Sequence, residues 1–320
     1  MAVNLFETVS VSDYFGRATN PRYLDLILHE HFSILNMPIH GTFEKFQKHK
    51  NIKKNRNMSI PCWDSSRVIL KSDCDVDYVH ANYVSGFNAD KKFVATQEPT
   101  AETLCDFFAM IWQENSYIVV MLTDTAQHSG PICPQYWASN NDCDTILKIF
   151  KVSAEKVTLH CYYTEITLSI LNGETGESRI IHFFKYFDWP AHGVPGNMAG
   201  FLDFIVAINK RQQSLLRKAL VIDHILPGPI VVHCSSGIGT GTLCAIDACL
   251  YQIVNTATIN VQAVVFRIRH QRHSSILSPE QYDFINNVLL YFLETMRTNI
   301  WVLLELRSHL FQKDLHLFLV

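Results

Sequence analysis

Apolar and polar positions along this chain follow two periods, one typical of helices and the other typical of strands. Short runs rich in β-branched residues predict strands at residues 92–97 and 117–122. Between them, apolar side chains spaced by three and four residues predict a helix, with Thr100 as the expected N-cap. The other expected elements are helices within 20–50, 197–219, 241–254 and 278–296, strands within 156–170, 179–187 and 229–234, and a turn at 172–176.

The order of these elements sets the expected fold class. Strands are interleaved with helices along the chain, which favours a sheet with helices packed on its faces. Residues 156–187 also contain strands that are close enough in sequence to pair as antiparallel neighbours. The pattern therefore predicts an α/β protein, or an α+β protein with a mostly mixed sheet.

Composition narrows the function classes. Of the 320 residues, 48% are hydrophobic and 18% are charged, which is enough apolar material for a sizeable core in one or two domains. A formal net charge of −3 argues against nucleic-acid binding. The N-terminus lacks the pattern of a signal peptide, and no apolar run reaches the roughly eighteen residues that predict a membrane span.

Cysteine usage indicates the compartment. The nine cysteines are odd in number and scattered, and no two of them form a CxxC pair. This arrangement predicts neither a zinc site nor a disulfide framework. A reducing, cytoplasmic location is therefore expected, with no metal and no other cofactor.

The stretch from Val231 to Ile246 reads VVHCSSGIGTGTLCAI and combines a nucleophile with a turn rich in glycine and hydroxyl groups. A strand delivers Cys234 and a helix follows, so backbone N–H groups and the helix dipole should favour an anion there. The same field is expected to lower the pKa of the Cys234 thiol and to permit a thiophosphoryl intermediate. The alternative is a buried structural cysteine. The expected phosphate loop consists of Ser235, Ser236, Gly237, Ile238 and Gly239.

Eight motifs resemble, in the same order, those of the catalytic domain of non-receptor protein tyrosine phosphatases. They are KNRNMSIPCWDSSRVIL, DYVHANYVSGF, FVATQEPT, DFFAMIWQENSYIVVMLT, CPQYW, FDWPAHGVP, VVHCSSGIGTGT and QRHSSILSPEQYDF. The resemblance implies a single phosphatase-like domain at residues 25–296, with a central twisted mixed β-sheet flanked by helices. Residues 1–24 would then be an N-terminal lead-in, and residues 297–320 a C-terminal extension that is expected to be helical.

The N-terminal pattern HEHFSILNMPIHGTFEKF is similar to that of a particular group within this family. It resembles the phosphatase-like proteins of polydnaviruses (bracoviruses), which parasitoid wasps deliver into insect hosts. This resemblance implies a viral protein that works in the host-cell cytoplasm. Its expected role is interference with host signalling, including signalling in immune cells.

The comparison with the family pattern also locates departures. The family loop reads SAGIGRTGT and this loop reads SSGIGTGT, so Thr240 stands at or next to the position of a missing phosphate-binding Arg. Ala191 replaces the Asp general acid, Asn57 replaces the Tyr that packs on the phosphotyrosine ring, and Leu277 replaces the Gln that positions water. Glu98 replaces a Gly, a change interpreted as an adjustment of the surface. The shorter loop is expected to distort the anion cradle.

These departures predict a protein that is not an enzyme, a pseudophosphatase in which Cys234 is a vestigial nucleophile. Such a protein would act by binding host signalling proteins, tyrosine-phosphorylated ones among them. Three alternatives stay open. The chain could be a weak phosphatase that works through a Cys234 thiophosphate, or carry Cys234 as an oxidisable thiol; it could trap phosphotyrosine substrates; or it could be a relic without a selected role.

Overall fold

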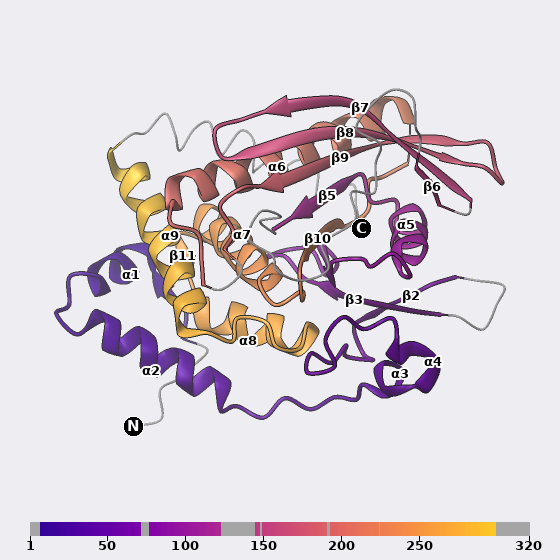
Figure 1. Cartoon of the computed structure of the whole chain (residues 1–320). Helices are drawn as coiled ribbons and strands as arrows, with labels where there is room; N and C mark the ends of the chain where they lie inside the picture. Colours follow the sequence, from indigo (N-terminus) through magenta and orange to yellow (C-terminus); the bar gives the residue numbers. More distant parts are fainter. Residues whose placement is uncertain are drawn as a thin grey trace.

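The computed structural model describes residues 7–71, 77–122, 145–147, 149–190, 193–223 and 225–298. Within these ranges, nine strands form one mixed sheet in the order β2-β3-β4-β10-β5-β9-β8-β7-β6, with helices on both faces (Figure 1). The predicted fold class is therefore confirmed. The strands are β2 (Arg67–Ile69), β3 (Tyr78–Val84), β4 (Phe93–Gln97), β5 (Ile118–Met121), β6 (Thr145–Leu147), β7 (Phe150–Leu159), β8 (Tyr163–Asn172), β9 (Ser178–Tyr186) and β10 (Ile230–Cys234).

The predicted helices are present, but the helices at Val11–Arg17 and Val261–Gln271 are not among the predictions. One predicted helix also differs at its boundary. The helix predicted after Thr100 begins only at Leu104, and its N-cap is Thr103, so Thr100 does not cap it. The reason is local, because the Thr103 hydroxyl accepts a hydrogen bond from the Thr100 N–H at 2.9 Å and holds residues 100–103 in a turn. The helices are α1 (Val11–Arg17), α2 (Tyr23–Leu35), α3 (Glu44–Gln47), α4 (His49–Ile52), α5 (Leu104–Gln113), α6 (Met198–Lys218), α7 (Thr240–Thr256), α8 (Val261–Gln271) and α9 (Pro279–Thr298), with a π-helical turn at Ala219–Asp223.

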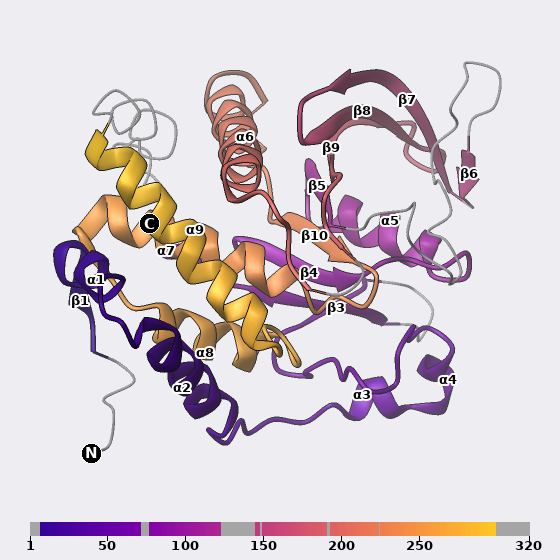
Figure 2. The same cartoon turned by 60° about the vertical axis from the view of Figure 1, so that its left-hand side comes forward.

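Strand β10 occupies the centre of the sheet and carries Cys234 at its carboxyl end. It pairs in parallel with β4 on one side and with β5 on the other. Its five residues are all buried, which explains the uninterrupted apolar run in the sequence. Val232 and Cys234 face the core beneath α6, α7, α8 and α9, whereas Val231 faces the core beneath α5. Figure 2 shows these two helical layers on opposite faces of the sheet.

The first described residues are packed onto the domain. Strand β1 (Val9–Ser10) pairs antiparallel with β11 (Thr258–Ile259). Helix α1 follows, and its buried Tyr14 donates a hydrogen bond from its hydroxyl to Asn286 Oδ1 of α9 at 2.6 Å. Residues 9–17, which lie within the expected lead-in, therefore share the core of the domain. Of the predicted C-terminal helix at 297–320, only residues 297 and 298 are described, and they belong to α9. The rest lies outside the described residues.

A buried polar network joins the sheet to two helices. The Lys92 ammonium lies 2.6 Å from Asp247 Oδ2 of α7 and donates to Asn209 Oδ1 of α6 at 3.0 Å. Asn209 in turn donates to Asp247 Oδ1 at 2.8 Å, and the Tyr251 ring lies 3.7 Å from the ammonium. Burial is the largest single effect and acts to lower the pKa of Lys92, but Asp247 and Tyr251 together outweigh it and the net shift is upward. The network therefore holds a charged lysine inside the protein.

No helix in the described part of the chain is long and apolar enough to cross a membrane.

Candidate active site

The residues predicted to form an anion cradle do form one compact turn around the Cys234 sulfur. Backbone N–H groups of Gly237, Gly239 and Thr240 lie near this sulfur and act to lower the pKa of its thiol. Helix α7 begins at Thr240, whose hydroxyl donates to the Gly237 carbonyl at 2.8 Å and closes the turn. Gly237 has a φ of +82°, in the left-handed region that glycine adopts without a steric penalty. The shortened loop thus retains inward-facing amides.

Two segments from elsewhere in the chain pack directly on this loop. A Cβ at Gly239 would lie 2.8 Å from the Trp189 ring, so the start of the FDWPAHGVP motif packs against the loop. A Cβ at Gly241 would lie 2.7 Å from the Ser275 Cβ, which brings the segment before α9 against the start of α7. The fold therefore brings together three of the motifs that the sequence singled out, although they lie far apart in the chain.

The predicted pKa shift of Cys234 has the wrong sign. Burial raises the pKa of the Cys234 thiol, and this effect outweighs the loop amides and the charge of Arg272, which act to lower it. The sequence pattern shows that a helix start follows the cysteine, but it cannot show that the sulfur is enclosed. The resting group is therefore a thiol, and the thiolate forms at a cost.

The interpretation of Glu98 as a surface adjustment is also wrong. Only 1% of its side chain is exposed, and its carboxylate lies 3.7 Å from the Arg56 guanidinium. The Glu98 N–H donates to the Cys234 carbonyl at 2.9 Å. Burial of Glu98 beside the loop follows from the position of β4 next to β10, which a single sequence does not reveal.

The substituted positions lie at different depths around the loop. Thr240 is fully buried within it, whereas Asn57 is exposed and uses its side-chain oxygen to accept from the Ser59 N–H at 2.8 Å. Leu277 is 42% exposed and immediately precedes the N-cap of α9. Ala191 lies outside the described residues. The roles assigned to these four positions from the family pattern stay predictions.

Arg272 is a residue of this site that the sequence analysis did not single out. It follows α8, its side chain is fully buried, and its Nη2 lies directly beneath Gly237, where it leaves no room for a Cβ. Its Nη1 donates to Asn82 Oδ1 at 2.9 Å and to His80 Nδ1 at 3.2 Å. The motif QRHSSILSPEQYDF contains Arg272, but its position under the loop depends on how α8 meets β3.

His80 is held neutral beside this arginine. Its Nδ1 accepts from Arg272, so its Nε2 carries the proton and donates to the Ile60 carbonyl at 2.9 Å. Burial, together with the charge of Arg272, lowers the pKa of His80 to about 3. Burial and the charge of Arg56 likewise lower the pKa of His233 to about 3. The sheet behind the loop thus holds two neutral imidazoles.

We expect the free energy of unfolding to fall as the pH drops from about 6.5 towards 3. The unfolded histidines bind protons below their ordinary pKa of about 6.5, whereas the folded ones do not until about pH 3. Each should therefore contribute a slope of up to about 1.4 kcal/mol per pH unit. Urea unfolding measured across this range tests the prediction, and the slope should be smaller in His80→Asn. A flat profile would contradict it.

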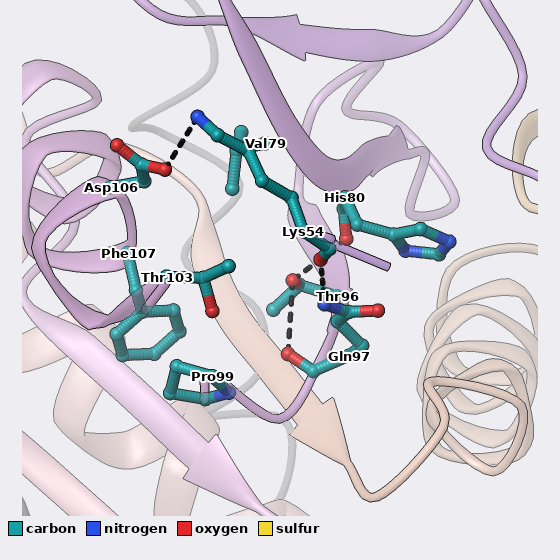
Figure 3. Close-up of a pocket in the computed structure, with 9 residues that line it drawn as sticks. All are labelled: Lys54, Val79, His80, Thr96, Gln97, Pro99, Thr103, Asp106 and Phe107. Atoms are coloured by element: carbon teal, nitrogen blue, oxygen red, sulfur yellow. Dashed lines mark hydrogen bonds and ion pairs between the residues drawn. The ribbon is translucent and has the colours of Figure 1, made fainter. Parts of the chain in front are cut away.

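A small pocket lies next to the site without belonging to it. Its volume is about 10 Å3, room for about one water molecule, and none of its lining residues comes from the Cys234 loop. Figure 3 shows Lys54 paired with Asp106 at 2.8 Å, and the Gln97 amide donating to the Lys54 carbonyl at 2.7 Å. The contacts among the lining residues therefore connect Lys54 and α5 to the end of β4. The pocket is lined by Lys54, Val79, His80, Thr96, Gln97, Pro99, Thr103, Asp106 and Phe107.

The arrangement of a cysteine, a glycine loop and a helix start on a central parallel strand can be compared with known families. The family model described as protein-tyrosine phosphatase matches residues 51–291, most of the chain. The chain belongs to the protein-tyrosine phosphatase family. The predicted resemblance is thereby confirmed, and the residues matched by the family model include the Cys234 loop.

The curated relatives of this phosphatase family member include viral and animal proteins. It is 39% identical over 303 residues to the probable tyrosine phosphatase protein N1 of Microplitis demolitor bracovirus, covering 92% of this chain and 93% of that protein. It is 34% identical to tyrosine phosphatase H3 of the same virus, over 90% and 95% of the two chains. It is also 34% identical to human tyrosine-protein phosphatase non-receptor type 9, over 79% of this chain and 44% of that protein. The similarity to bracovirus proteins is confirmed.

These matches correct the prediction that the chain is not an enzyme. That prediction is wrong because residues 51–291 match a phosphatase family and the relatives include proteins named as tyrosine phosphatases. Substitutions at family positions do not by themselves show that the chemistry is lost. The structure retains Cys234, loop amides near its sulfur and a buried guanidinium next to Gly237.

Proposed function

We propose that this protein is a slow protein-tyrosine phosphatase that uses Cys234 as its nucleophile. The observation that carries the proposal is the placement of Cys234 at the end of β10, in a turn closed by Thr240 at the start of α7, with the amides of Gly237, Gly239 and Thr240 near its sulfur. Amides in this arrangement stabilise the oxygens of a phosphoryl group as readily as a sulfur anion.

The reaction has two steps. In the first, the Cys234 thiolate attacks phosphorus, the bond from phosphorus to the tyrosyl oxygen breaks, and that oxygen takes a proton from water. In the second, water attacks the thiophosphoryl group, the sulfur–phosphorus bond breaks, and inorganic phosphate leaves as the thiolate is restored. The N–H groups of the loop donate hydrogen bonds to the phosphoryl oxygens in both steps.

A low rate follows from the substituted positions. The family pattern assigns protonation of the leaving group to the position of Ala191, and an alanine cannot donate a proton. The same pattern assigns a water-positioning amide to Leu277 and an aromatic wall for the substrate ring to Asn57. Burial of the Cys234 thiol, which raises its pKa, reduces the reactive fraction further.

The expected substrates are tyrosine-phosphorylated signalling proteins in the cytoplasm of an insect host cell. The support for this part is the similarity to bracovirus proteins that are named as tyrosine phosphatases. Removal of phosphate from such proteins would interfere with host signalling, in immune cells in particular. A pull-down from host-cell lysate, prepared with and without tyrosine phosphorylation, identifies the partners.

The proposal is tested with purified full-length protein, a tyrosine-phosphorylated peptide and a small aryl phosphate. Phosphate release should exceed background in the wild type and fall to background in Cys234→Ser, which changes little besides the nucleophile. Cys161→Ser is the matched control, because Cys161 is exposed and lies on the connection between β7 and β8. Phosphate release that persists in Cys234→Ser, or that is absent from the wild type, would contradict the proposal.

A further inference from the structure

The Arg272 side chain is a buried cation with an unusual set of partners. Its side chain is fully enclosed, and its Nη1 is held by two neutral groups, the Asn82 amide oxygen and the His80 imidazole. Its Nε and Nη2 have no hydrogen-bond acceptor within the described residues. No carboxylate in that part of the chain lies within 4 Å of the guanidinium. A buried charge without a counter-ion is costly, so a structural role alone explains it poorly.

The unpartnered side of this guanidinium points at the phosphatase loop. Nη2 lies directly beneath Gly237, and the left-handed φ of +82° at this glycine lets the backbone curve over it. The amides of Gly237 and Gly239 also lie near the Cys234 sulfur. The guanidinium and the sulfur are therefore both buried and both lie next to Gly237.

We propose that Arg272 is the cation of the Cys234 loop, and that it stabilises from beneath the negative charge of the thiolate and of a bound phosphate ester dianion. The family places its phosphate-binding Arg within the loop, and this loop has no Arg or Lys. A guanidinium that packs against Gly237 from outside the loop does not form the two direct hydrogen bonds to phosphate that a loop Arg forms, so it acts through charge and through the position of Gly237. Arg272 is thus a positioning residue for the reaction assigned above, on which this inference rests.

Two substitutions that introduce long, polar side chains separate the effect of the Arg272 charge from the effect of its structural role. Arg272→Lys keeps the positive charge, and Arg272→Gln removes it while leaving an N–H donor for Asn82. The first measurement is the rate of iodoacetamide alkylation at Cys234 as a function of pH, followed by mass spectrometry. The second is the affinity for tungstate, a tetrahedral dianion, read from protection of Cys234 against alkylation. Arg269→Met is the matched control, because Arg269 lies three residues earlier, in α8, and its Nη1 donates to the Ser275 carbonyl at 2.7 Å.

In Arg272→Gln we expect the alkylation profile to move to higher pH and tungstate affinity to fall about 10- to 100-fold, as expected for the loss of a charge near an anion. Arg272→Lys should keep most of both properties, and Arg269→Met should change neither by more than about twofold. Equal profiles for wild type and Arg272→Gln, or an equal loss in the Arg269 variant, would overturn the inference. If Arg272→Gln does not fold, Arg272→Met takes its place.

The same experiment distinguishes this inference from the proposed function. If Cys234-dependent phosphate release occurs and the Arg272 variants leave the alkylation profile and tungstate affinity unchanged, the phosphatase assignment stands and the inference fails. If the Arg272 variants shift both properties while no variant releases phosphate, the inference stands and the assignment fails.

Discussion

Replacing Ala191 with Asp is expected to increase the rate of phosphate release from a tyrosine-phosphorylated peptide by about 10²- to 10⁴-fold, the usual contribution of a positioned general acid. The tyrosyl oxygen is a poor leaving group when it departs as an anion, and in the present sequence water must protonate it. The motif that carries Ala191 reaches the loop, because the Trp189 ring packs against Gly239. The Ala191→Asp substitution therefore introduces a carboxylic acid two residues along the chain from a ring that packs on the Cys234 loop.

The rate increase in Ala191→Asp should depend on how readily the leaving group departs and on the acidic proton of the introduced side chain. Ala191→Asn, which has the same shape as the Asp variant but no acidic proton, is the matched control and should leave the rate near that of the wild type. The gain in the Asp variant should also be smaller with an activated aryl phosphate, whose leaving group departs without protonation. Steady-state rates with both substrates check this prediction. Equal rates for the Asp and Asn variants would show that protonation of the leaving group does not limit turnover.

Removing the buried cation of the Lys92 network should have the largest effect on stability. In Lys92→Met, the Asp247 carboxylate loses a partner at 2.6 Å while only 2% of its side chain is exposed. Breaking a buried ion pair from one side costs about 3–5 kcal/mol of unfolding free energy, because the remaining charge stays buried. Asn209 still donates to Asp247, which softens but does not remove this cost. Urea unfolding at neutral pH measures the loss.

A second lysine provides the control for this experiment. Lys45 pairs with Asp77 at 3.1 Å, but about a third of the Lys45 side chain is exposed. The substitution Lys45→Met should therefore cost no more than about 1 kcal/mol. Similar losses for the two variants would mean that burial does not set the strength of these pairs. The double variant Lys92→Met with Asp247→Leu should recover part of the loss, because it leaves no unpaired charge inside the protein.

The sequence was sufficient to predict the elements of this fold where burial is uniform along an element. Residues 229–234 are apolar without interruption because β10 is covered on both faces, and the run predicts a central strand. Helix α9 begins at Pro279 with Ser278 as its cap, as its terminal residues predict; the Ser278 hydroxyl accepts from the Gln281 N–H at 3.3 Å. Both predictions depend on local pattern alone.

The wrong predictions at the site have one physical cause in common. Each of them depends on how deeply a side chain is buried, which the sequence does not show. The sign of the Cys234 pKa shift depends on how completely the sulfur is enclosed. The burial of Glu98 and of Arg272 depends on which strand and which helix lie beside the loop. None of these is fixed by neighbours in sequence. A motif therefore located the nucleophile, and only the fold located the charges around it.

The position of β10 also determines at which stage of folding the Cys234 site can form. The two halves of the sheet, β2-β3-β4 and β5-β9-β8-β7-β6, are synthesised before residue 230, and β10 is the strand that joins them by hydrogen bonds. A nascent chain that stops short of this strand holds two separate ribbons with exposed inner edges. Because such distant pairings close slowly, assembly of the sheet and completion of the nucleophile's surroundings are one and the same late event in folding.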